Sequence, residues 1–359
     1  MMHNPIRVGI THGDFNGIGY EVIVKVLDGE EVAELFTPVI FGSAEILNQV
    51  RKEVGSETFH FISVRSAAEA QNGKVNVVDV CARGLELTPG HPSKEAGEAA
   101  VAALEAACLA LEEGEIDFLV TAPINKKTVY SEKFPFPGHT EFLAQRLADE
   151  EGKATMILFD DDIRVALVTT HKALRDVPDA ITKDSVKNTI KNMDAALRQD
   201  FRMDKPRIAV LSLNPHNGDN GLLGSEEIRE IEPAIAECVA EGILAFGPFA
   251  ADGFFGTGDY AKYDGIVAMY HDQGLAPFKA LAREYGVNYT AGLKYVRTSP
   301  DHGTGYNIAG RNEADPTSMR QAIYQGIDLT RNRALHREAT ANPLQKMKQD
   351  RRQKPAAEE

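Results

Sequence analysis

Residues 268–310 read AMYHDQGLAPFKALAREYGVNYTAGLKYVRTSPDHGTGYNIAG and are the most informative stretch of the chain. Short apolar, strand-like runs alternate here with a helical pattern and Gly-rich turns, which is typical of an α/β fold. The stretch also holds imidazole, carboxylate, ammonium and guanidinium groups, a mixture that fold alone rarely requires. It suits a site that holds a metal and an anionic substrate together. The residues concerned are His271, Asp272, Lys279, Asn288, Arg297, Asp301 and His302.

The same alternation continues outward along almost the whole chain and predicts an α/β architecture with a largely parallel sheet. Ten strands are too many for one sheet of ordinary width, so two lobes are expected. Residues 335–359 lose apolar periodicity and are predicted to form a charged, solvated tail, with a partner-binding basic patch as the alternative. Strands are predicted at 6–10, 38–41, 59–64, 75–80, 118–121, 155–159, 165–169, 208–213, 265–270 and 287–290, and helices at 18–27, 44–54, 94–113, 141–150, 183–199, 226–241, 275–284 and 316–333.

The composition limits the possible partners and the compartment. The 359 residues include 39 basic and 53 acidic side chains, a net charge of −14. This balance argues against nucleic acid or an anionic membrane as the main partner. No apolar run approaches the roughly 18 residues of a spanning helix, and no secretory h-region follows the N-terminus. The isolated Cys81, Cys108 and Cys238 are expected to be reduced thiols in a cytoplasmic protein.

Three histidines each follow a strand-like run: His171 in VALVTTHKAL, His216 in IAVLSLNPHNGD and His271 in GIVAMYHDQGL. Ligands of open α/β sheets gather at the carboxyl ends of strands, so the three imidazoles are predicted to converge. Three neutral imidazoles with open positions suit a catalytic divalent cation. The alternative is that each ring caps or packs locally.

Groups that bind anions are spread over three segments. His139 and Thr140 begin a predicted helix, where free N–H groups and the helix dipole favour a phosphate. Lys279, Asn288 and Arg297 add an ammonium, an amide and a bidentate guanidinium. Surface solvation and turn formation are the alternatives for each of them. Lys126 and its neighbour in TAPINKK are equally ambiguous.

The N-terminal segment GITHGDFNGIGYEV has the pattern of a strand, a Gly-rich turn and a helix. It matches neither the G-x-G-x-x-G fingerprint nor the G-x-x-x-x-G-K-[ST] loop. A Rossmann nucleotide site and a Walker A loop are therefore rejected. Gly13, Gly17 and Gly19 are best explained by a tight turn that lets the backbone approach a ligand.

These motifs together resemble the 4-hydroxythreonine-4-phosphate dehydrogenases of vitamin B6 biosynthesis. The resemblance implies a two-lobed, isocitrate/isopropylmalate dehydrogenase-like α/β/α fold and a homodimer whose active sites are shared between subunits. One lobe would contain residues 1–119 and 263–334, and the other residues 120–262. The matching segments are GITHGDFNGIGYEV, TAPINK, GHTEFLA, THKALRDVP, LNPHNGD, GPFAADGFF, YDGIVAMYHDQGLAPFKAL, GVNYTAGL and RTSPDHGT.

The resemblance also implies a role for individual residues. His171, His216 and His271 would hold one divalent metal ion, Zn, Mg or Co. The substrate would be bound by His139, Thr140, Lys279, Asn288 and Arg297, and NAD or NADP by the loop that contains His302, Gly303, Thr304 and Asn307. Asp252 and Asp272 match carboxylates near the reacting carbon. The candidates for the general base are Asp252, Asp272 and Lys126, and the sequence does not distinguish among the three.

Four positions depart from the family pattern. Asp14-Phe15-Asn16 replaces a usual Asp-Pro-Ala, and Gly253 replaces a usual Thr. Asn307 stands where many relatives carry an Asp, which would accept from a ribose hydroxyl and repel a 2′-phosphate. The choice between NAD and NADP therefore stays open.

The implied reaction is oxidation of 4-phosphooxy-L-threonine to 2-amino-3-oxo-4-phosphooxybutyrate. The latter would decarboxylate to 3-amino-2-oxopropyl phosphate, in pyridoxal 5′-phosphate biosynthesis. One alternative is an enzyme of the same fold that oxidises threonate or erythronate 4-phosphate. The other, from a different class, is a non-catalytic regulatory protein that binds a metal and a phosphate.

Overall fold

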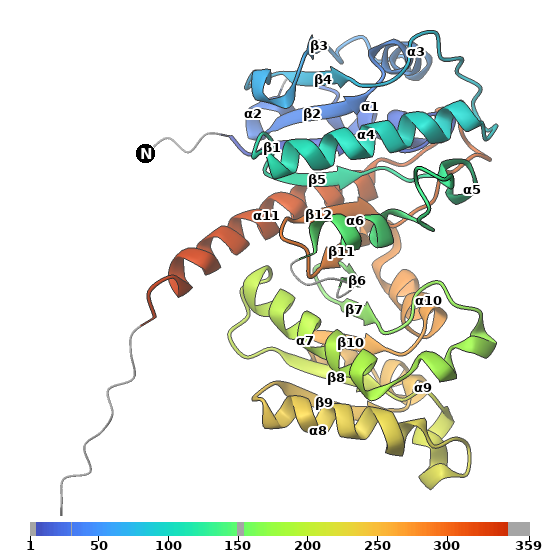
Figure 1. The fold of residues 1–359 in the computed structure, drawn as a ribbon, viewed down its shortest axis with the longest axis vertical. Coiled ribbons are helices and arrows are strands. Elements are labelled where there is room, and N and C mark those ends of the chain that lie inside the picture. Colours follow the sequence, from blue (N-terminus) through green and yellow to red (C-terminus); the bar gives the residue numbers. More distant parts are fainter. Residues whose placement is uncertain (1–4, 30, 149–153, 344–359) are drawn as a thin grey trace, which may run out of the picture.

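The structure is a computed structural model that describes residues 5–29, 31–148 and 154–343. Its twelve described strands form one sheet with the order β3-β4-β2-β1-β5-β12-β11-β6-β7-β10-β8-β9, which runs through the whole molecule (Figure 1). The strands are β1 (Arg7–Thr11), β2 (Thr37–Gly42), β3 (Phe61–Val64), β4 (Val75–Asp79), β5 (Phe118–Thr121), β6 (Thr155–Phe159), β7 (Arg164–Leu167), β8 (Arg207–Leu211), β9 (Leu244–Phe249), β10 (Gly265–Ala268), β11 (Val287–Ala291) and β12 (Arg297–Pro300).

Strand direction changes only near the middle of this sheet. The pairs β12–β11, β11–β6 and β6–β7 are antiparallel. All the other strand pairs of the sheet are parallel. The predicted α/β architecture with a mostly parallel sheet is therefore confirmed. We call β5, β12, β11 and β6 the central strands.

Helices cover both faces of the sheet (Figure 1). Local signals explain several of their ends. Ser43 accepts a hydrogen bond from the backbone N of Ile46 at the start of α3, and Gly55, with φ of 74°, ends that helix. Thr182 and Ser185 form a reciprocal capping box on α7. The helices are α1 (Gly19–Leu27), α2 (Val32–Leu35), α3 (Ala44–Val54), α4 (Lys94–Glu112), α5 (Lys126–Val129), α6 (His139–Leu147), α7 (Lys183–Gln199), α8 (Glu232–Ala240), α9 (Ala251–Gly256), α10 (His271–Ala282) and α11 (Thr317–Thr340).

Several of the observed elements differ from the prediction. Strands β9 and β12 were not predicted, because LAFGPF is largely exposed and RTSP is polar although buried. Helix α10 begins at His271 instead of residue 275, so its first turn carries His271 and Asp272. Helix α11 continues to Thr340, so residues 335–340 of the predicted tail are helical. Residues 344–359 of that tail, and residues 149 and 150 of the helix predicted at 141–150, lie outside the described residues.

The expectation that the strands are too many for one sheet is wrong, because the central strands join the two halves by continuous pairing. Strand β10, which the predicted division gives to the first lobe, pairs with β7 and β8 of the second. The lobe boundaries stay a prediction. Within the described part of the chain, no helix is long and apolar enough to cross a membrane.

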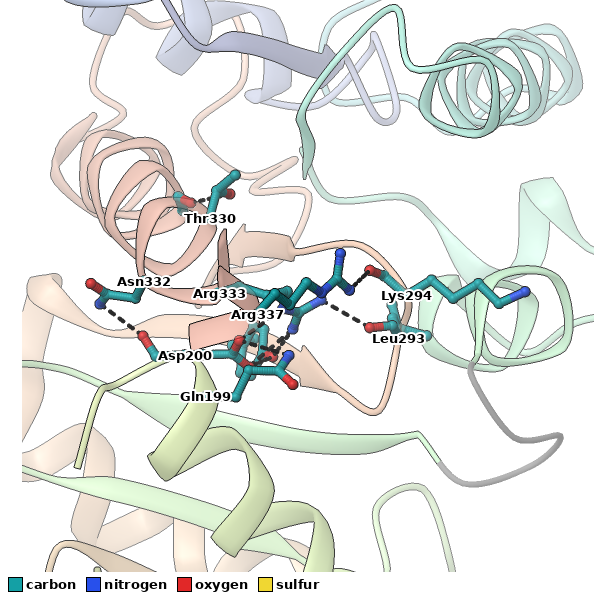
Figure 2. Close-up of polar contacts among 10 residues, drawn as sticks. Gln199, Asp200, Leu293, Lys294, Thr330, Asn332, Arg333 and Arg337 are labelled. Carbon is teal, nitrogen blue, oxygen red and sulfur yellow. Dashed lines mark hydrogen bonds and ion pairs between the residues drawn. The ribbon is translucent and has the colours of Figure 1, made fainter. Parts of the chain in front are cut away.

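A buried ion pair also ties the two halves together (Figure 2). The Arg333 guanidinium on α11 donates to both carboxylate oxygens of Asp200, just beyond α7, at 2.7 and 3.0 Å. The Tyr289 hydroxyl on β11 donates to the same carboxylate. Asn332 Nδ2 donates to the Asp200 carbonyl at 2.8 Å. Asp200, Arg333 and Tyr289 are all buried, so this network fixes α7 and α11 against the centre of the sheet.

Candidate functional site

A cavity of about 250 Å³ lies over the central strands, beside the first turn of α6. All four central strands contribute to its lining: Thr121 from β5, Arg297, Ser299 and Pro300 from β12, Asn288 from β11 and Met156 from β6. Seven of the predicted site residues line this cavity, together with Gly303 of the predicted cofactor loop. They are Lys126, His139, Thr140, His171, Asn288, Arg297 and His302.

Arg297 lies at the floor of the cavity and is only 2% exposed. Its guanidinium donates to the Thr121 hydroxyl from Nε at 3.1 Å and to the Thr290 hydroxyl from Nη1 at 3.1 Å. No carboxylate of the described residues forms an ion pair with it. Burial lowers the pKa of Arg297 to about 10, so the group is still a cation at neutral pH. A buried cation without an anion is costly, which indicates that a ligand supplies the anion.

His139 is the first residue of α6 and follows Gly138. Burial, together with the nearby Arg297 and Lys126 charges, holds the pKa of His139 well below its usual range. The ring is therefore neutral at physiological pH. His302 behaves in the same way, since burial lowers its pKa as well. Both rings can donate or accept a hydrogen bond without adding charge to the cavity.

Four polar atoms of the cavity lining are buried and have no hydrogen-bond partner among the described residues. They are His139 Nε2, Glu141 Oε2, Asn288 Oδ1 and His302 Nε2. Buried polar groups are almost always hydrogen-bonded in native proteins, because an unpaired one costs about 1–3 kcal/mol. Four such atoms in one cavity indicate that they await the polar groups of a ligand.

Glu141 is a cavity residue that the sequence did not single out. It lies in the first turn of α6, and its Oε1 is 3.5 Å from Nδ1 of His171. The His171 contact lowers the pKa of Glu141, so the side chain is a carboxylate. An acidic residue in a first helical turn is ordinarily explained by the helix dipole, so the sequence alone did not indicate that Glu141 lines the cavity.

The three predicted metal ligands are only partly brought together. The rings of His171 and His271 lie 6.5 Å apart between centroids. Asp272 Oδ1 is 2.7 Å from Nδ1 of His271, and Glu141 faces Nδ1 of His171. These contacts favour leaving Nε2 of each ring free, the usual arrangement of carboxylate-oriented metal ligands. The donor set therefore suits a divalent cation, although no group of three metal-ligating side chains forms within the described residues of one chain.

His216 lies on a separate, exposed turn at Pro215–Gly221. Five successive residues there, from His216 to Asn220, have positive φ angles of 43–74°. Four of them are not glycine, and such residues are rarely left-handed, so this turn is strained. His216 does not line the cavity.

Six other predicted residues also lie outside the cavity lining: His271, Asp252, Asp272, Lys279, Thr304 and Asn307. Asp252 is exposed in the first turn of α9, and Asp272 is exposed beside His271. Lys279 Nζ forms an ion pair with Asp301 Oδ1 at 3.1 Å. Of the three candidates for general base, Lys126 is therefore the one that lines the cavity.

The predicted cofactor loop packs against the N-terminal Gly-rich turn. The backbone N of Ile18 donates to the Thr304 carbonyl at 2.9 Å, and the Tyr306 hydroxyl donates to Asp14 Oδ2 at 2.8 Å. A Cβ on Gly17 would lie 2.5 Å from the Thr304 carbonyl oxygen, so only glycine allows this approach. Asn307 is exposed. The loop and the turn are thus packed together and hydrogen-bonded.

The unusual Asn16 has a structural function that the sequence did not show. Its side chain is buried, accepts from the backbone N of Thr88 at 2.8 Å and donates to the His91 carbonyl at 2.9 Å. An alanine here would make neither bond. Asn16 therefore holds the segment before α4 against the Gly-rich turn.

Known proteins share both the sequence and the fold. The profile of the family described as "Pyridoxal phosphate biosynthetic protein PdxA" matches residues 34–326. A 4-hydroxythreonine-4-phosphate dehydrogenase of Bacteroides thetaiotaomicron is 51% identical over 352 residues, 98% of this chain and 96% of that protein. The crystal structure of 4-hydroxythreonine-4-phosphate dehydrogenase from Klebsiella pneumoniae is similar with a TM-score of 0.80 and 34% identity, covering 91% of this chain and 100% of that one. The corresponding enzyme from Burkholderia phymatum gives a TM-score of 0.74 and 38% identity, with coverages of 91% and 98%.

Proposed function

Since the chain belongs to the family of pyridoxal phosphate biosynthetic protein PdxA, a family of dehydrogenases, we propose that it oxidises 4-phosphooxy-L-threonine. The proposed product is 2-amino-3-oxo-4-phosphooxybutyrate, which loses carbon dioxide to give 3-amino-2-oxopropyl phosphate. NAD or NADP would accept the hydride, and one divalent ion, Zn, Mg or Co, would be required. The step would serve pyridoxal 5′-phosphate biosynthesis.

The observation that best supports this proposal is the unpaired Arg297 cation at the floor of the cavity. The substrate carries a phosphate and a carboxylate, and a guanidinium binds either of them with two parallel hydrogen bonds. His139 and Thr140, at the start of α6, add a neutral donor and a hydroxyl. Lys279 lies outside the lining in this conformation, so we assign it to the rim of the anion site.

His171 and His271 are the proposed metal ligands of one chain, with Asp272 and Glu141 fixing the orientation of their rings. A bound divalent cation would act as a Lewis acid toward the C3 hydroxyl of the substrate. Lys126 is the proposed general base, because it lines the cavity whereas Asp252 and Asp272 do not; as a resting ammonium it would have to release its own proton before it takes that of the hydroxyl. His302, Gly303, Thr304 and Asn307 are proposed to hold the cofactor next to this cavity. Hydride would then pass from C3 to the nicotinamide.

We further propose that the third imidazole, His216, completes the site of a second copy in a homodimer. The turn that carries it is exposed, and Leu222 just beyond it is 78% exposed. An exposed leucine beside a strained polar turn is a poor surface for a monomer and a suitable one for an interface. Sedimentation velocity should show a dimer, and Leu222→Ser should weaken it. A wild-type monomer at micromolar concentration would contradict this proposal.

The assay that tests the function compares three phosphates. Reduction of NAD and of NADP is followed by absorbance with 4-phosphooxy-L-threonine, threonate 4-phosphate and erythronate 4-phosphate, each with and without a chelator. We expect turnover with 4-phosphooxy-L-threonine that a chelator abolishes and added metal restores. Turnover only with a sugar-acid phosphate would replace the proposed substrate. No nicotinamide reduction with any of the three would favour a non-catalytic binding protein.

A further inference from the structure

We infer that Glu141 recognises the ammonium group of the substrate and makes the cavity selective for an amino acid phosphate over the matching hydroxy acid. This inference rests on the proposed function. It concerns a residue that the comparison of motifs did not mark, and it follows from the charges and the unpaired atoms of the cavity.

The charges of the cavity complement those of a phosphorylated amino acid. Lys126 and Arg297 are its two cationic side chains, and Glu141 is the one carboxylate in the lining that the structure describes. The proposed substrate carries two anionic groups and one ammonium. If Lys126 and Arg297 bind the two anionic groups of the substrate, Glu141 is the remaining charged side chain. Its charge is opposite to that of the ammonium. A sugar-acid phosphate has a neutral hydroxyl at the same carbon and does not require a carboxylate there.

The unpaired atoms give the same assignment independently. Glu141 Oε2 and Asn288 Oδ1 are acceptors, both are buried in the cavity, and neither has a donor within the described chain. An ammonium carries three N–H donors, so it can supply the donors that such acceptors lack. Hydrogen bonds to a charged group are the strong class, so the pairing gives selectivity as well as affinity.

The contact with the His171 ring involves one of the two oxygens of the Glu141 carboxylate. Oε1 lies 3.5 Å from His171 Nδ1, whereas Oε2 is buried and has no hydrogen-bond partner among the described residues. The absence of a side chain at Gly138 keeps this space open, because a Cβ there would lie 3.3 Å from Oε2. Both the amino and the hydroxy substrate need a base for the C3 hydroxyl. A change in selectivity between the two substrates therefore reports on recognition of the ammonium group and not on catalysis by Glu141.

The test measures selectivity in the full-length, metal-loaded enzyme with saturating NAD. Values of kcat/KM are obtained for 4-phosphooxy-L-threonine and for threonate 4-phosphate, the latter also as a competitive inhibitor. Calorimetric titration of 4-phosphooxy-L-threonine without NAD gives a Kd that does not depend on turnover. We expect Glu141→Gln to lower the ratio of the two kcat/KM values by about 10- to 100-fold, mainly through KM for the amino substrate. The Kd should rise by a similar factor, while the inhibition constant of threonate 4-phosphate should change by less than about threefold.

Two further variants complete the design. Gly138→Ala keeps Glu141 but crowds Oε2, so it should shift the selectivity ratio in the same direction by a smaller factor, even if Glu141→Gln folds poorly. Glu105→Gln, an exposed carboxylate on α4, should leave both constants unchanged. An equal loss for both ligands in Glu141→Gln, or an unchanged ratio, would overturn the inference. Failure of the wild-type enzyme to oxidise 4-phosphooxy-L-threonine would instead refute the proposed function.

Discussion

Arg297 illustrates how a single residue can serve binding at the expense of stability. Among the described residues, its buried guanidinium donates only to the hydroxyl groups of Thr121 and Thr290. Arg297→Met keeps the volume but removes the desolvated charge, so we expect the free energy of unfolding to rise by about 1 kcal/mol or more. The same change should raise KM for the phosphorylated substrate by about 100-fold with a smaller effect on kcat. Urea unfolding and steady-state kinetics measure the two effects. A variant that is less stable than wild type, or that keeps its KM, would show that the charge has another role.

His12 predicts how stability depends on pH. The ring is fully buried and stacked on Tyr20, and burial lowers its pKa from 6.5 to about 4. Between about pH 4 and pH 6.5 the unfolded chain therefore binds a proton at this position that the folded chain does not. Stability must fall as the pH is lowered through this window, by up to about 1.4 kcal/mol per unit for this one group. We expect His12→Gln to show a shallower slope of unfolding free energy against pH from 5 to 6.5. Parallel slopes for the two proteins would contradict this explanation.

At this scale the sequence predicted eight of the sixteen residues that line the cavity, because imidazole, guanidinium and amide groups after strand-like runs are uncommon without a site. It missed Glu141, whose position in a first helical turn has an ordinary explanation in the helix dipole. It also missed Thr121 and Thr290, since a threonine in a strand is expected for β-propensity alone. The signal that reveals all three is their contact with Arg297 or His171, which only the fold provides.

At the scale of elements, the packing of α11 on β5 depends on one glycine. A Cβ on Gly326 would lie 2.2 Å from Cε2 of Phe118, much closer than carbon atoms can approach. We expect Gly326→Ala to lower the free energy of unfolding by about 1–3 kcal/mol, although alanine favours a helix by about 1 kcal/mol over glycine. Phe118→Leu combined with Gly326→Ala should recover part of the loss. Thermal or urea unfolding of the two single variants and the double variant checks this. A Gly326→Ala protein as stable as wild type would show that α11 can move away without cost.

Sequence patterns predicted the elements whose buried residues recur with the period of a strand or of a helix. Strands such as β1 and β8 are mostly apolar and buried on both faces, so they are recognised in the sequence as continuous apolar runs. Strand β12 escaped prediction because its four residues, RTSP, are all buried yet mostly polar. The buried Thr298 hydroxyl bonds the Ala322 carbonyl of α11, and Arg297 faces the cavity. Its burial therefore depends on partners distant in sequence, which no local pattern records.

At the scale of the whole molecule, the Asp200–Arg333 pair predicts a strong coupling between the halves of the sheet. Arg333→Met leaves the Asp200 carboxylate buried without its cation, so we expect a loss of about 3–5 kcal/mol in the free energy of unfolding. Replacing the carboxylate as well, in Asp200→Asn with Arg333→Met, should restore at least half of that loss. A double-mutant cycle measured by urea unfolding gives the coupling energy. Additive effects of the two substitutions would mean that the pair does not act as a unit.

For a related reason, the sequence could not predict that the twelve described strands join into one sheet. Periodicity predicts that a segment is a strand but not which strand lies beside it. Here β12 pairs with β5, and β11 pairs with β6, so both connections link segments far apart in the chain. The expectation of separate sheets rested on typical sheet widths, which say nothing of such long-range pairs.

The pairing of β5 with β12 has a consequence for biosynthesis on the ribosome. The hydrogen-bonded residues Thr121 and Arg297 are 176 positions apart in the chain. At translation rates of about 5–20 residues per second, roughly 10–35 s separate their emergence. During that time the nascent chain can complete β3, β4, β2, β1 and β5, but the outer edge of β5 has no neighbour and lacks the cover of α11. An apolar, unpaired strand edge promotes association with other chains, so the interval before β12 emerges is when this protein most needs a chaperone.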